Sequence, residues 1–512
     1  MYYHGVVDYL KISVIDLGFN SAKLVIYNVK DDDSFDVYQQ EGIKVRLGEG
    51  LDEKGKLGKK PMSRAIDTLQ VFRDIIQLNP IKSVLPIATS AVREARNKED
   101  FLNSISKETG FNFKVLSERE EALYSYVGAI KSLHIPDSLF FDIGGGSLEI
   151  VYAERFKIKK VISLPLGALR LTHQFDGRKG KFTEKNLKDL KRYIWNLLPG
   201  KKDLDMSKNA KLVGVGGALR ALARYEQRVS LYPLDKIHNY KISRKSLDST
   251  INGLSKMKSE DLSSISVLGS SRSETIIAGS YVIETLMEKY DFSDLYVSNH
   301  GLREGALSIF LEDPKAYHDG YLTAEQIRKT IGIEDQRITS TDKEIFLNTL
   351  LSIKLISKRE RKILDFAEKI MSEKSSFSSP QSVFYSIMDE DIPLDHNDQL
   401  VLGLSLVHAR HTKTSDWLFA RYNTILSQQD KTSMKKISAL ITLRKILERT
   451  KSKIELRPHG SRIIEITVIQ SRSTQKFLLK DALKKFETVF DVKVILSTRP
   501  YQGSSQSSIL EL

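Results

Sequence analysis

The sequence contains no cysteine, which excludes disulfides, thiolate-bound zinc and a cysteine nucleophile. It contains no run of about 18 apolar residues that could span a membrane. The N-terminal segment MYYHGVVDYLKIS also lacks the charged start, apolar core and small-residue cleavage site of an export signal. We therefore expect a cytoplasmic protein without a membrane partner.

The formal charge of +14 over 512 residues biases the surface toward polyanions such as nucleic acid, nucleotides, polyphosphate or anionic lipid. The segment 431–480 has thirteen Lys and Arg against three Glu, and is a candidate track for a polyanion. The sequence shows no zinc-finger spacing, RNA-binding aromatic signature or clear helix-turn-helix pattern. We therefore do not expect nucleic acid to be the main partner.

The N-terminal half alternates short apolar runs with turns and with helical patterns. Strand-like runs at 11–16, 22–29 and 34–40 predict a three-stranded meander. Further strands are expected at 83–88 and 113–116, with helices at 62–78, at 93–108 and from Ser117. Strands that alternate with helices after a meander predict an α/β domain with a mixed sheet.

This half also contains an internal repeat. Residues 16–27, DLGFNSAKLVIY, align without gaps with residues 142–153, DIGGGSLEIVYA, through shared Asp, Gly, Ser and aliphatic positions. Such self-similarity predicts two copies of one α/β unit. In each copy a strand ends in Asp, turns through Gly and returns as a second strand. Two facing copies would place two phosphate-sized turns across one cleft.

The two turns carry groups suited to phosphate and to a metal ion. Backbone N–H groups of a Gly-containing turn form a concave nest for phosphate oxygens, and Ser147 adds a hydroxyl. Each turn begins with Asp, an oxygen ligand suited to Mg²⁺. Glu149 lies on the same strand face as Ser147, because side chains alternate along a strand. The alternative is two ordinary hairpins that need Gly, but the repetition favours a phosphate site.

From about Tyr317 the pattern becomes helical. A Ser-rich segment at 372–382 is expected to be a loop, and amphipathic stretches lie at 323–331, 342–357, 359–373, 397–411, 415–427 and 432–450. The final part predicts a small α/β domain, with strands at 462–470 and 492–496 and a helix at 480–490. The last twelve residues are expected to fray.

Several segments resemble the exopolyphosphatase and guanosine pentaphosphate phosphohydrolase (Ppx/GppA) family, which belongs to the ASKHA superfold of actin and sugar kinases. Besides the two turns, they are KVRLGEGLDEKGKL at 44–57, ATSAVREARN at 88–97, LSEREEALYSYVGA at 116–129, LPLGALRL at 164–171, VGVGGALRALA at 213–223 and GLREGAL at 301–307. The resemblance implies a duplicated, actin-like (ribonuclease H-like) two-lobed domain, with lobes at 1–132 and 133–314. A helical HD-like domain would follow at 315–452, and a small basic α/β domain at 453–512.

The resemblance also implies roles for individual residues. The family's catalytic carboxylate falls on Glu121, which would position and deprotonate the water that attacks phosphorus. Arg93 matches a phosphate-binding arginine. Asp142 and Glu149 would hold Mg²⁺, assisted by Asp16. The other phosphate contacts would come from Asn20, Ser21, Gly144, Gly145, Gly146 and Ser147.

Local sequence alone leaves simpler interpretations open. Glu118, Glu120 and Glu121 are also what the first turn of a helix capped by Ser117 would carry. A third glycine turn, at Gly214, Gly216 and Gly217, is expected either to face the distal phosphates or to serve packing. Arg303 and Glu304 are expected to begin a helix that closes the second lobe.

Two departures from the family pattern stand out. Phe19 occupies a position where the family has Ser, so one hydroxyl donor to phosphate is lost while the backbone nest can persist. In the helical region His408 and His411 are spaced to share a helix face, and His396, Asp395 and Asp398 lie nearby. We assign no His-Asp pair to this region, and therefore expect a degenerate HD-like domain.

The resemblance favours an exopolyphosphatase that uses Mg²⁺ to hydrolyse the terminal phosphate of inorganic polyphosphate. One alternative is a guanosine pentaphosphate 5′-phosphohydrolase with the same cleft chemistry. A second is a non-catalytic sensor of polyphosphate or nucleotide, and a third is a kinase that uses ADP as acceptor. The family further implies a homodimer.

Overall fold

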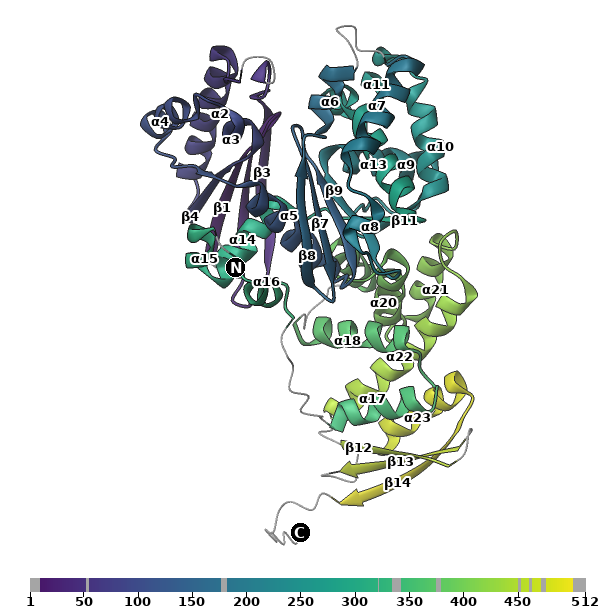
Figure 1. The fold of residues 1–512 in the computed structure, drawn as a ribbon. Helices are drawn as coiled ribbons and strands as arrows, with labels where there is room; N and C mark the ends of the chain where they lie inside the picture. The colour runs from purple at the N-terminus through teal and green to yellow at the C-terminus, as the bar shows by residue number, and fades with distance from the viewer. Residues whose placement is uncertain are drawn as a thin grey trace. The chain divides into compact units, whose positions relative to one another are not determined.

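A computed structural model describes residues 10–51, 55–175, 182–320, 322–333, 342–373, 379–449, 453–459, 463–470 and 476–500 (Figure 1). The chain divides into two compact units, residues 1–334 and 335–512, and each is described by itself. The last twelve residues and the centre of the Ser-rich segment, for which we expected fraying and a loop, lie outside the described residues.

The first unit opens with a five-stranded mixed sheet. Its strands are β1 (Leu10–Leu17), β2 (Ser21–Val29), β3 (Phe35–Lys44), β4 (Ile81–Ala88) and β5 (Lys114–Val115), in the order β3-β2-β1-β4-β5. The first three strands pair antiparallel, which confirms the predicted meander, and β4 and β5 then add in parallel.

A second sheet repeats this topology. Its strands are β6 (Ser138–Ile143), β7 (Leu148–Glu154), β8 (Lys157–Leu164), β9 (Lys211–Gly216), β10 (Tyr240–Ser243) and β11 (Asp294–Val297), in the order β10-β11-β9-β6-β7-β8. β6, β7 and β8 pair antiparallel as β1, β2 and β3 do, while β9 and β11 add in parallel like β4 and β5. The duplication predicted from the repeated turn is therefore confirmed in the sheet order.

Both faces of the central strands β1, β2, β6 and β7 are largely apolar and buried, because successive side chains point to opposite faces and each face packs on a core. In β1, Ile12 and Val14 face a core between the two sheets, whereas Ile15 and Leu17 face a core under the outer helices. The outer helices of the first sheet are α2 (Lys59–Gln77), α3 (Ser90–Glu94) and α4 (Lys98–Thr109). The second sheet is covered by α6 (Ala168–Phe175), α7 (Glu184–Leu197), α8 (Lys201–Leu204), α9 (Gly217–Val229), α10 (Arg244–Ser255), α11 (Ser259–Ser264), α12 (Gly269–Ser273) and α13 (Ile276–Tyr290).

Two helices, α5 (Glu118–Leu133) and α14 (Leu302–Glu312), contribute to the core between the sheets (Figure 1). They cross closely through glycines: a Cβ on Gly128 would lie 2.1 Å from the carbonyl oxygen of Gly301. The Ser117 side chain accepts from the Glu120 N–H and the Glu120 side chain accepts from the Ser117 N–H, so α5 begins with the expected cap. The helix that begins near Arg303 packs on α5 and β1 and shares the core between the sheets with β9, so it joins both lobes instead of closing only the second, as expected.

The helix expected at 93–108 is broken into α3 and α4. Ala95 has an extended backbone, with φ −76° and ψ 129°. Asn97 follows, and its side chain exchanges hydrogen bonds with the backbone of Leu57 at 2.9 and 3.1 Å. This contact with a distant segment overrides the local helical pattern.

Two helices beyond the expected boundary at 314 also belong to the first unit. They are α15 (Pro314–Asp319) and α16 (Ala324–Thr330), and their residues Tyr317 and Ile327 are buried in the core between the sheets. The division of the chain into lobes and domains at the expected residue numbers stays a prediction.

The second unit contains a helical part and a small sheet. The helices are α17 (Asp342–Ser352), α18 (Lys358–Glu373), α19 (Pro380–Asp389), α20 (His396–His408), α21 (Thr412–Arg421) and α22 (Gln428–Arg449). β12 (Lys453–Pro458), β13 (Ile463–Gln470) and β14 (Lys493–Pro500) form the sheet in that order, and α23 (Lys476–Phe490) connects β13 to β14. α19 and β12 were not predicted. Among the described residues, no helix is both long and apolar enough to cross a membrane.

A buried, hydrogen-bonded carboxylate fixes the start of α14. Tyr27 donates its hydroxyl to Glu304 Oε1 at 2.7 Å, and the backbone N–H of Gly301 donates to Glu304 Oε2 at 2.8 Å. Burial alone would raise the pKa of Glu304, but the Arg303 charge and these hydrogen bonds hold it at about 2. The ionised carboxylate therefore ties α14 to β2.

We expect Glu304→Gln to lower the free energy of unfolding at pH 7 by about 3 kcal/mol, because a depressed carboxylate pKa stabilises the folded state above its unfolded pKa. This stability is lost as pH falls from about 4.5 toward 2, so wild type and variant should converge there in urea denaturation. Tyr27→Phe is the milder control, with a loss of about 1 kcal/mol. A constant gap between Glu304→Gln and wild type from pH 7 to pH 3 would contradict this account.

Candidate active site

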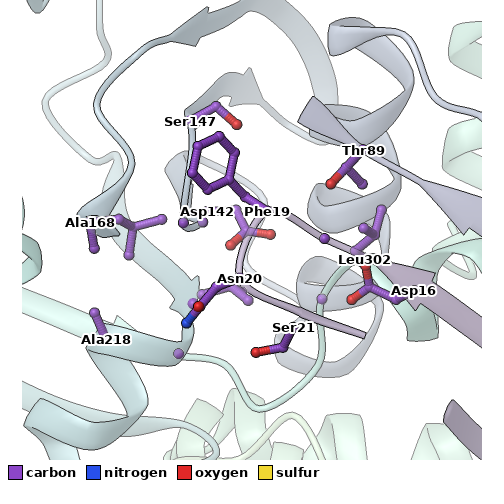
Figure 2. A pocket seen from close by; sticks show the side chains of 18 of the residues that line it. Asp16, Phe19, Asn20, Ser21, Thr89, Asp142, Ser147, Ala168, Ala218 and Leu302 are labelled. Carbon is purple, nitrogen blue, oxygen red and sulfur yellow. The ribbon is translucent and has the colours of Figure 1, made fainter. Parts of the chain in front are cut away.

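The two predicted turns close in the same way and touch each other. Gly18 donates its backbone N–H to the carbonyl of Ser21 at 3.1 Å, and Gly144 donates to Ser147 at 3.0 Å. A Cβ added to Gly145 would lie 3.5 Å from the Cβ of Asn20. Figure 2 shows side chains of both turns around one pocket, as the duplicated sequence predicted.

Most of the expected site residues line this pocket. Three of them do not: Arg93 contacts the lining residue Glu121, Gly146 packs on Phe19, and Glu149 is buried on β7. The expected residues that line the pocket are Asp16, Asn20, Ser21, Glu121, Asp142, Gly144, Gly145 and Ser147. The structure thus brings these residues together, and their individual roles stay predictions.

Glu121 lies in the first turn of α5 and is only 8% exposed. Arg93 Nη1 donates to Glu121 Oε2 at 2.7 Å and to the carbonyl of Leu116 at 2.9 Å. Burial raises the pKa of Glu121 to about 7, although the Arg93 charge lowers it in part. A carboxyl group with this pKa can accept a proton near neutral pH, which is what a general base requires.

Asp142 and Glu149 are opposite partners in the β6–β7 hairpin. Ser125 donates its hydroxyl to Asp142 Oδ2 at 2.7 Å, and Ser163 donates to Glu149 Oε1 at 3.2 Å. Burial raises the pKa of Asp142 and, helped by the Glu121 and Asp142 charges, raises that of Glu149 well above its usual range. Buried carboxylates that repel one another need a cation nearby.

The donor set fits a hard divalent cation. Four carboxylates, Asp16, Glu121, Asp142 and Glu304, line the pocket, and the first three are not already used to fix a helix start, so they can offer oxygen ligands. Within the described residues they do not form a group whose ligand atoms all lie within 4.8 Å of one another. One or two carboxylates that leave the remaining positions to water and phosphate oxygens are typical of Mg²⁺ sites.

Four half-buried cations also line the pocket, and sequence reasoning missed three of them. They are Lys23 from β2, Arg220 from α9, Arg272 from α12 and Arg303 from α14. The Arg303 charge, followed by burial, lowers the pKa of Lys23 to about 7, while burial lowers that of Arg220 to about 10. Such mutual repulsion is relieved by an anion.

The repeat contained a signal for one of these cations. Lys23 and Glu149 occupy equivalent positions of the two copies, and each pairs across its hairpin with the Asp that ends the preceding strand. The same strand position therefore supplies a cation in one copy and a carboxylate in the other. No comparable pattern marks Arg220 or Arg272, because the fold alone brings α9 and α12 to the pocket.

The third glycine turn is a strand-to-helix junction. β9 ends at Gly216, whose φ of 129° favours glycine, and α9 begins at Gly217. Both line the pocket, whereas Gly214 is packed under Phe141. A Cβ on Gly217 would lie 2.4 Å from the guanidinium carbon of Arg272, so this glycine leaves room for the cation.

Phe19 lines the pocket but is only 3% exposed. A Cβ on Gly48 would lie 2.2 Å from its ring, and one on Gly146 would lie 2.5 Å from it. The ring therefore fills space between the two turns (Figure 2). The departure from the family's Ser replaces a polar donor with an apolar contact.

The histidines of the helical region do not form the expected helix face. α20 ends at His408, and His411 is the N-cap of α21 with φ −140°. His408 is buried and its Nδ1 lies 2.8 Å from Ser438 Oγ, while Asp398 accepts from Arg359. The one His-Asp dipeptide of the chain, His318–Asp319, lies in α15 of the first unit. The HD-like assignment stays a prediction.

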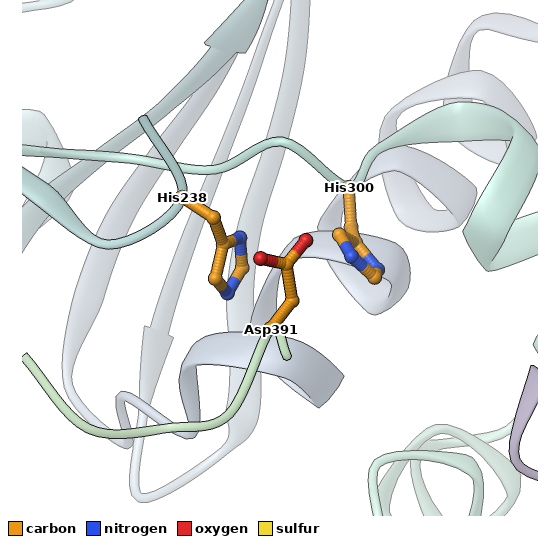
Figure 3. Close-up of side chains that lie close together, drawn as sticks. All are labelled: His238, His300 and Asp391. Atoms are coloured by element: carbon orange, nitrogen blue, oxygen red, sulfur yellow. The ribbon is translucent and has the colours of Figure 1, made fainter. Parts of the chain in front are cut away.

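Two further histidines of the first unit lie close together and were not singled out in the sequence. His238 precedes β10 and His300 precedes α14, and their ring centroids are 5.1 Å apart (Figure 3). The backbone N–H of Asn299 donates to His238 Nδ1 at 3.3 Å. Asp391, also labelled in Figure 3, belongs to the second unit. We assign this pair to packing of the two loops.

Comparison with known proteins matches the first unit. The model of the Ppx/GppA phosphatase family matches residues 25–312. An exopolyphosphatase 1 of Mycobacterium tuberculosis is 26% identical over 308 residues, which cover 58% of this chain and 87% of that protein. A bifunctional 3-dehydroquinate synthase/phosphatase of Fusobacterium nucleatum is 28% identical over 311 residues, and the match spans 46% of its length.

Solved structures show the same fold. A Ppx/GppA family member from Aquifex aeolicus is 28% identical with a TM-score of 0.50, and the match covers 59% of this chain and 98% of that one. An exopolyphosphatase from Cytophaga hutchinsonii is 25% identical with a TM-score of 0.55, and the match covers 59% and 97%. These likenesses confirm the family resemblance and fit the actin-like two-lobed domain.

The ion pair at the pocket predicts a measurable shift in the titration of Glu121. Because the Arg93 charge and hydrogen bond lower the pKa of Glu121, Arg93→Met should raise it above about 7. The measurement is carboxyl ¹³C NMR of chelator-treated protein labelled at glutamate, with the signal assigned by Glu121→Gln. Arg93→Lys, which keeps the charge, should shift the pKa less. A pKa that falls in Arg93→Met would contradict the pairing.

Proposed function

The chain belongs to the Ppx/GppA phosphatase family, and from that membership we propose that it hydrolyses the terminal phosphate of inorganic polyphosphate. The single observation that carries the proposal is a pocket lined both by a buried carboxylate of raised pKa, Glu121, and by four cations. A chain of phosphates needs both: a base for water at its end and positive charge along its length. Relatives named exopolyphosphatase support this choice of substrate.

The proposed reaction consumes one water for each phosphate removed. The two turns present backbone N–H groups and the hydroxyls of Ser21 and Ser147 to the terminal phosphate. Glu121 accepts a proton from the water as its oxygen attacks phosphorus in line with the bridging oxygen. The bond from phosphorus to the bridging oxygen breaks, and the shortened chain leaves with that oxygen. The products are orthophosphate and a chain one unit shorter.

Arg93 has two tasks in this scheme. Its hydrogen bond to Glu121 fixes the carboxylate, and its charge keeps part of the Glu121 population ionised near neutral pH. The guanidinium is also suited to bind a phosphate oxygen that gains charge during the reaction.

Asp142 and Asp16 would hold Mg²⁺, with Glu149 supporting from behind the pocket lining. When bound, Mg²⁺ supplies positive charge to the phosphate oxygens. Ser125 fixes Asp142 by its hydrogen bond, so the carboxylate is oriented before any ligand arrives.

The four cations would bind the phosphates beyond the terminal one. Lys23, with its pKa of about 7, would become more fully charged when an anion lies beside it. The basic segment 431–480 belongs to the second unit and would engage a longer chain. Guanosine pentaphosphate remains the alternative substrate, and the homodimer remains a separate prediction.

We expect Glu121→Gln to lower the rate of phosphate release from long polyphosphate with Mg²⁺ by about 10² or more, since general-base catalysis commonly contributes that much. Glu118→Gln is the matched control, because this exposed acid lies in the same helical turn. Binding measured by calorimetry should survive in both variants. A wild type that binds polyphosphate and releases nothing would overturn the hydrolase proposal in favour of a sensor, and ATP formed on addition of ADP would indicate a kinase.

A second prediction concerns the cations. Arg272→Gln should raise the KM for polyphosphate about tenfold, because a hydrogen bond to a charged group contributes about 1.5–3 kcal/mol. Gly217→Ala should have the same effect, since the added methyl displaces the Arg272 guanidinium, and the two changes combined should not be additive. Gly253→Ala is the control, because a Cβ there meets nothing within 4 Å. A normal KM in both variants would contradict a role for Arg272 in binding.

A further inference from the structure

Arg170, near the start of α6, is one of the residues that join the two lobes beside the pocket. We propose that Arg170 is a positioning residue whose ion pair with Glu94 holds the second turn against α3. We call this ion pair the latch. It keeps Arg93 and Glu121 correctly placed relative to the bound phosphate. The proposal rests on the proposed function for its catalytic consequence. The contacts that form the latch lie within the first unit and can be tested without that function.

The second-lobe end of the latch is fixed by the backbone. The N–H groups of Leu169 and Arg170 both donate to the carbonyl of Gly145 at 3.0 Å, and Ala168 donates to Gly144 at 3.0 Å. A Cβ on Gly167 would lie 2.3 Å from the carbonyl carbon of Gly146, so α6 starts directly against the turn. Arg170 therefore moves with the second turn as one body.

The first-lobe end of the latch is Glu94. Arg170 Nη2 lies 2.6 Å from Glu94 Oε2, with the arginine side chain 11% exposed and the glutamate 37%. Glu94 is the last residue of α3, and the residue before it, Arg93, donates to Glu121 at 2.7 Å. The Arg170–Glu94 ion pair therefore lies one residue away from Arg93, which contacts the proposed base Glu121.

Phe19 completes the contact from the first turn. The Arg170 guanidinium lies 5.4 Å from the centroid of its ring, within the range of a cation–π interaction. The same ring packs on Gly146, so the first turn, the second turn and Arg170 meet at one place. Leu169, next to Arg170, is buried in the core of the first lobe, which makes this an apolar as well as an ionic junction.

A second group of ion pairs, formed by Glu274 with Lys44 and Arg46, also joins the two lobes. Glu274, just before α13, accepts from Lys44 at 3.0 Å and from Arg46 at 3.3 Å. It lies far in sequence from α3 and does not involve Arg93. Loss of Arg170 alone is therefore expected to loosen the lobes without separating them, and loss of both contacts to loosen them further.

The chain has no cysteine, so a pair of spin labels reports the lobe separation directly. Asp67→Cys on α2 and Ser249→Cys on α10 place labels at exposed positions, one on each lobe. Distance distributions from double electron–electron resonance are compared for wild type, Arg170→Met, Glu94→Gln, and Arg170→Met with Glu274→Gln. Glu49→Gln is the matched control, because it removes an ion pair to Arg64 within the first lobe.

We expect Arg170→Met and Glu94→Gln to broaden the distance distribution toward longer distances, the double variant to broaden it further, and Glu49→Gln to leave it unchanged.

In phosphate-release assays Arg170→Met should lower kcat about tenfold or more while KM stays within about twofold, since misplacement of Arg93 and Glu121 acts on the reacting geometry. Arg170→Lys should recover part of kcat. An unchanged distribution in Arg170→Met overturns the latch whether or not the chain hydrolyses polyphosphate. A broadened distribution with normal kcat would overturn the positioning role, and an inactive wild type with broadening in Arg170→Met would sink only the proposed function.

Discussion

The site depends on one constraint: charges of like sign are held close together and away from water. Glu121 and Glu149 are buried and Asp142 is half-buried, and desolvation raises the pKa of each. Lys23 and Arg220 are half-buried beside two further arginines; the Arg303 charge and desolvation lower the pKa of Lys23, and desolvation lowers that of Arg220. Desolvation makes either set of charges unfavourable by itself, and Arg93, Lys23 and Arg220 compensate only part of the charge on the carboxylates. A ligand that brings a cation to the carboxylates and a row of phosphates to the cations relieves both.

Gene duplication of a hairpin explains how one fold holds both sets. The two hairpins share a register, so that Asp16 faces Lys23 in one copy and Asp142 faces Glu149 in the other. Neither arrangement is available to a single hairpin, because one strand position cannot be both a lysine and a glutamate. The core between the sheets, with α5 and α14 in it, packs strands of both copies together. The two hairpins thus have the same backbone arrangement, and the difference in charge between them comes from the difference in their sequences.

The sequence could predict features that a pattern in the chain encodes, but not those that depend on contacts between residues far apart in the chain. The meander, the repeat and the Ser117 cap follow from local patterns, and all three are confirmed. The break between α3 and α4 depends on Asn97 binding the backbone of Leu57, a contact no local pattern encodes. Arg220 and Arg272 reach the pocket from separate helices, so only the fold identifies them. Arg303 was noticed, but its helix packs on α5 and β1 as well as in the core shared with the second sheet, which the sequence did not indicate.

Phe19 has a role that the lost group alone does not indicate. The sequence indicated the loss of a hydroxyl donor and a backbone nest that can persist. In the structure the ring contacts Gly146 of the other turn and lies beneath Arg170, so the substitution adds a link between the lobes. A turn pair already joined by the protein loses less freedom when a phosphate chain binds. Preorganisation of the two turns therefore acts against the loss of the hydrogen bond to phosphate.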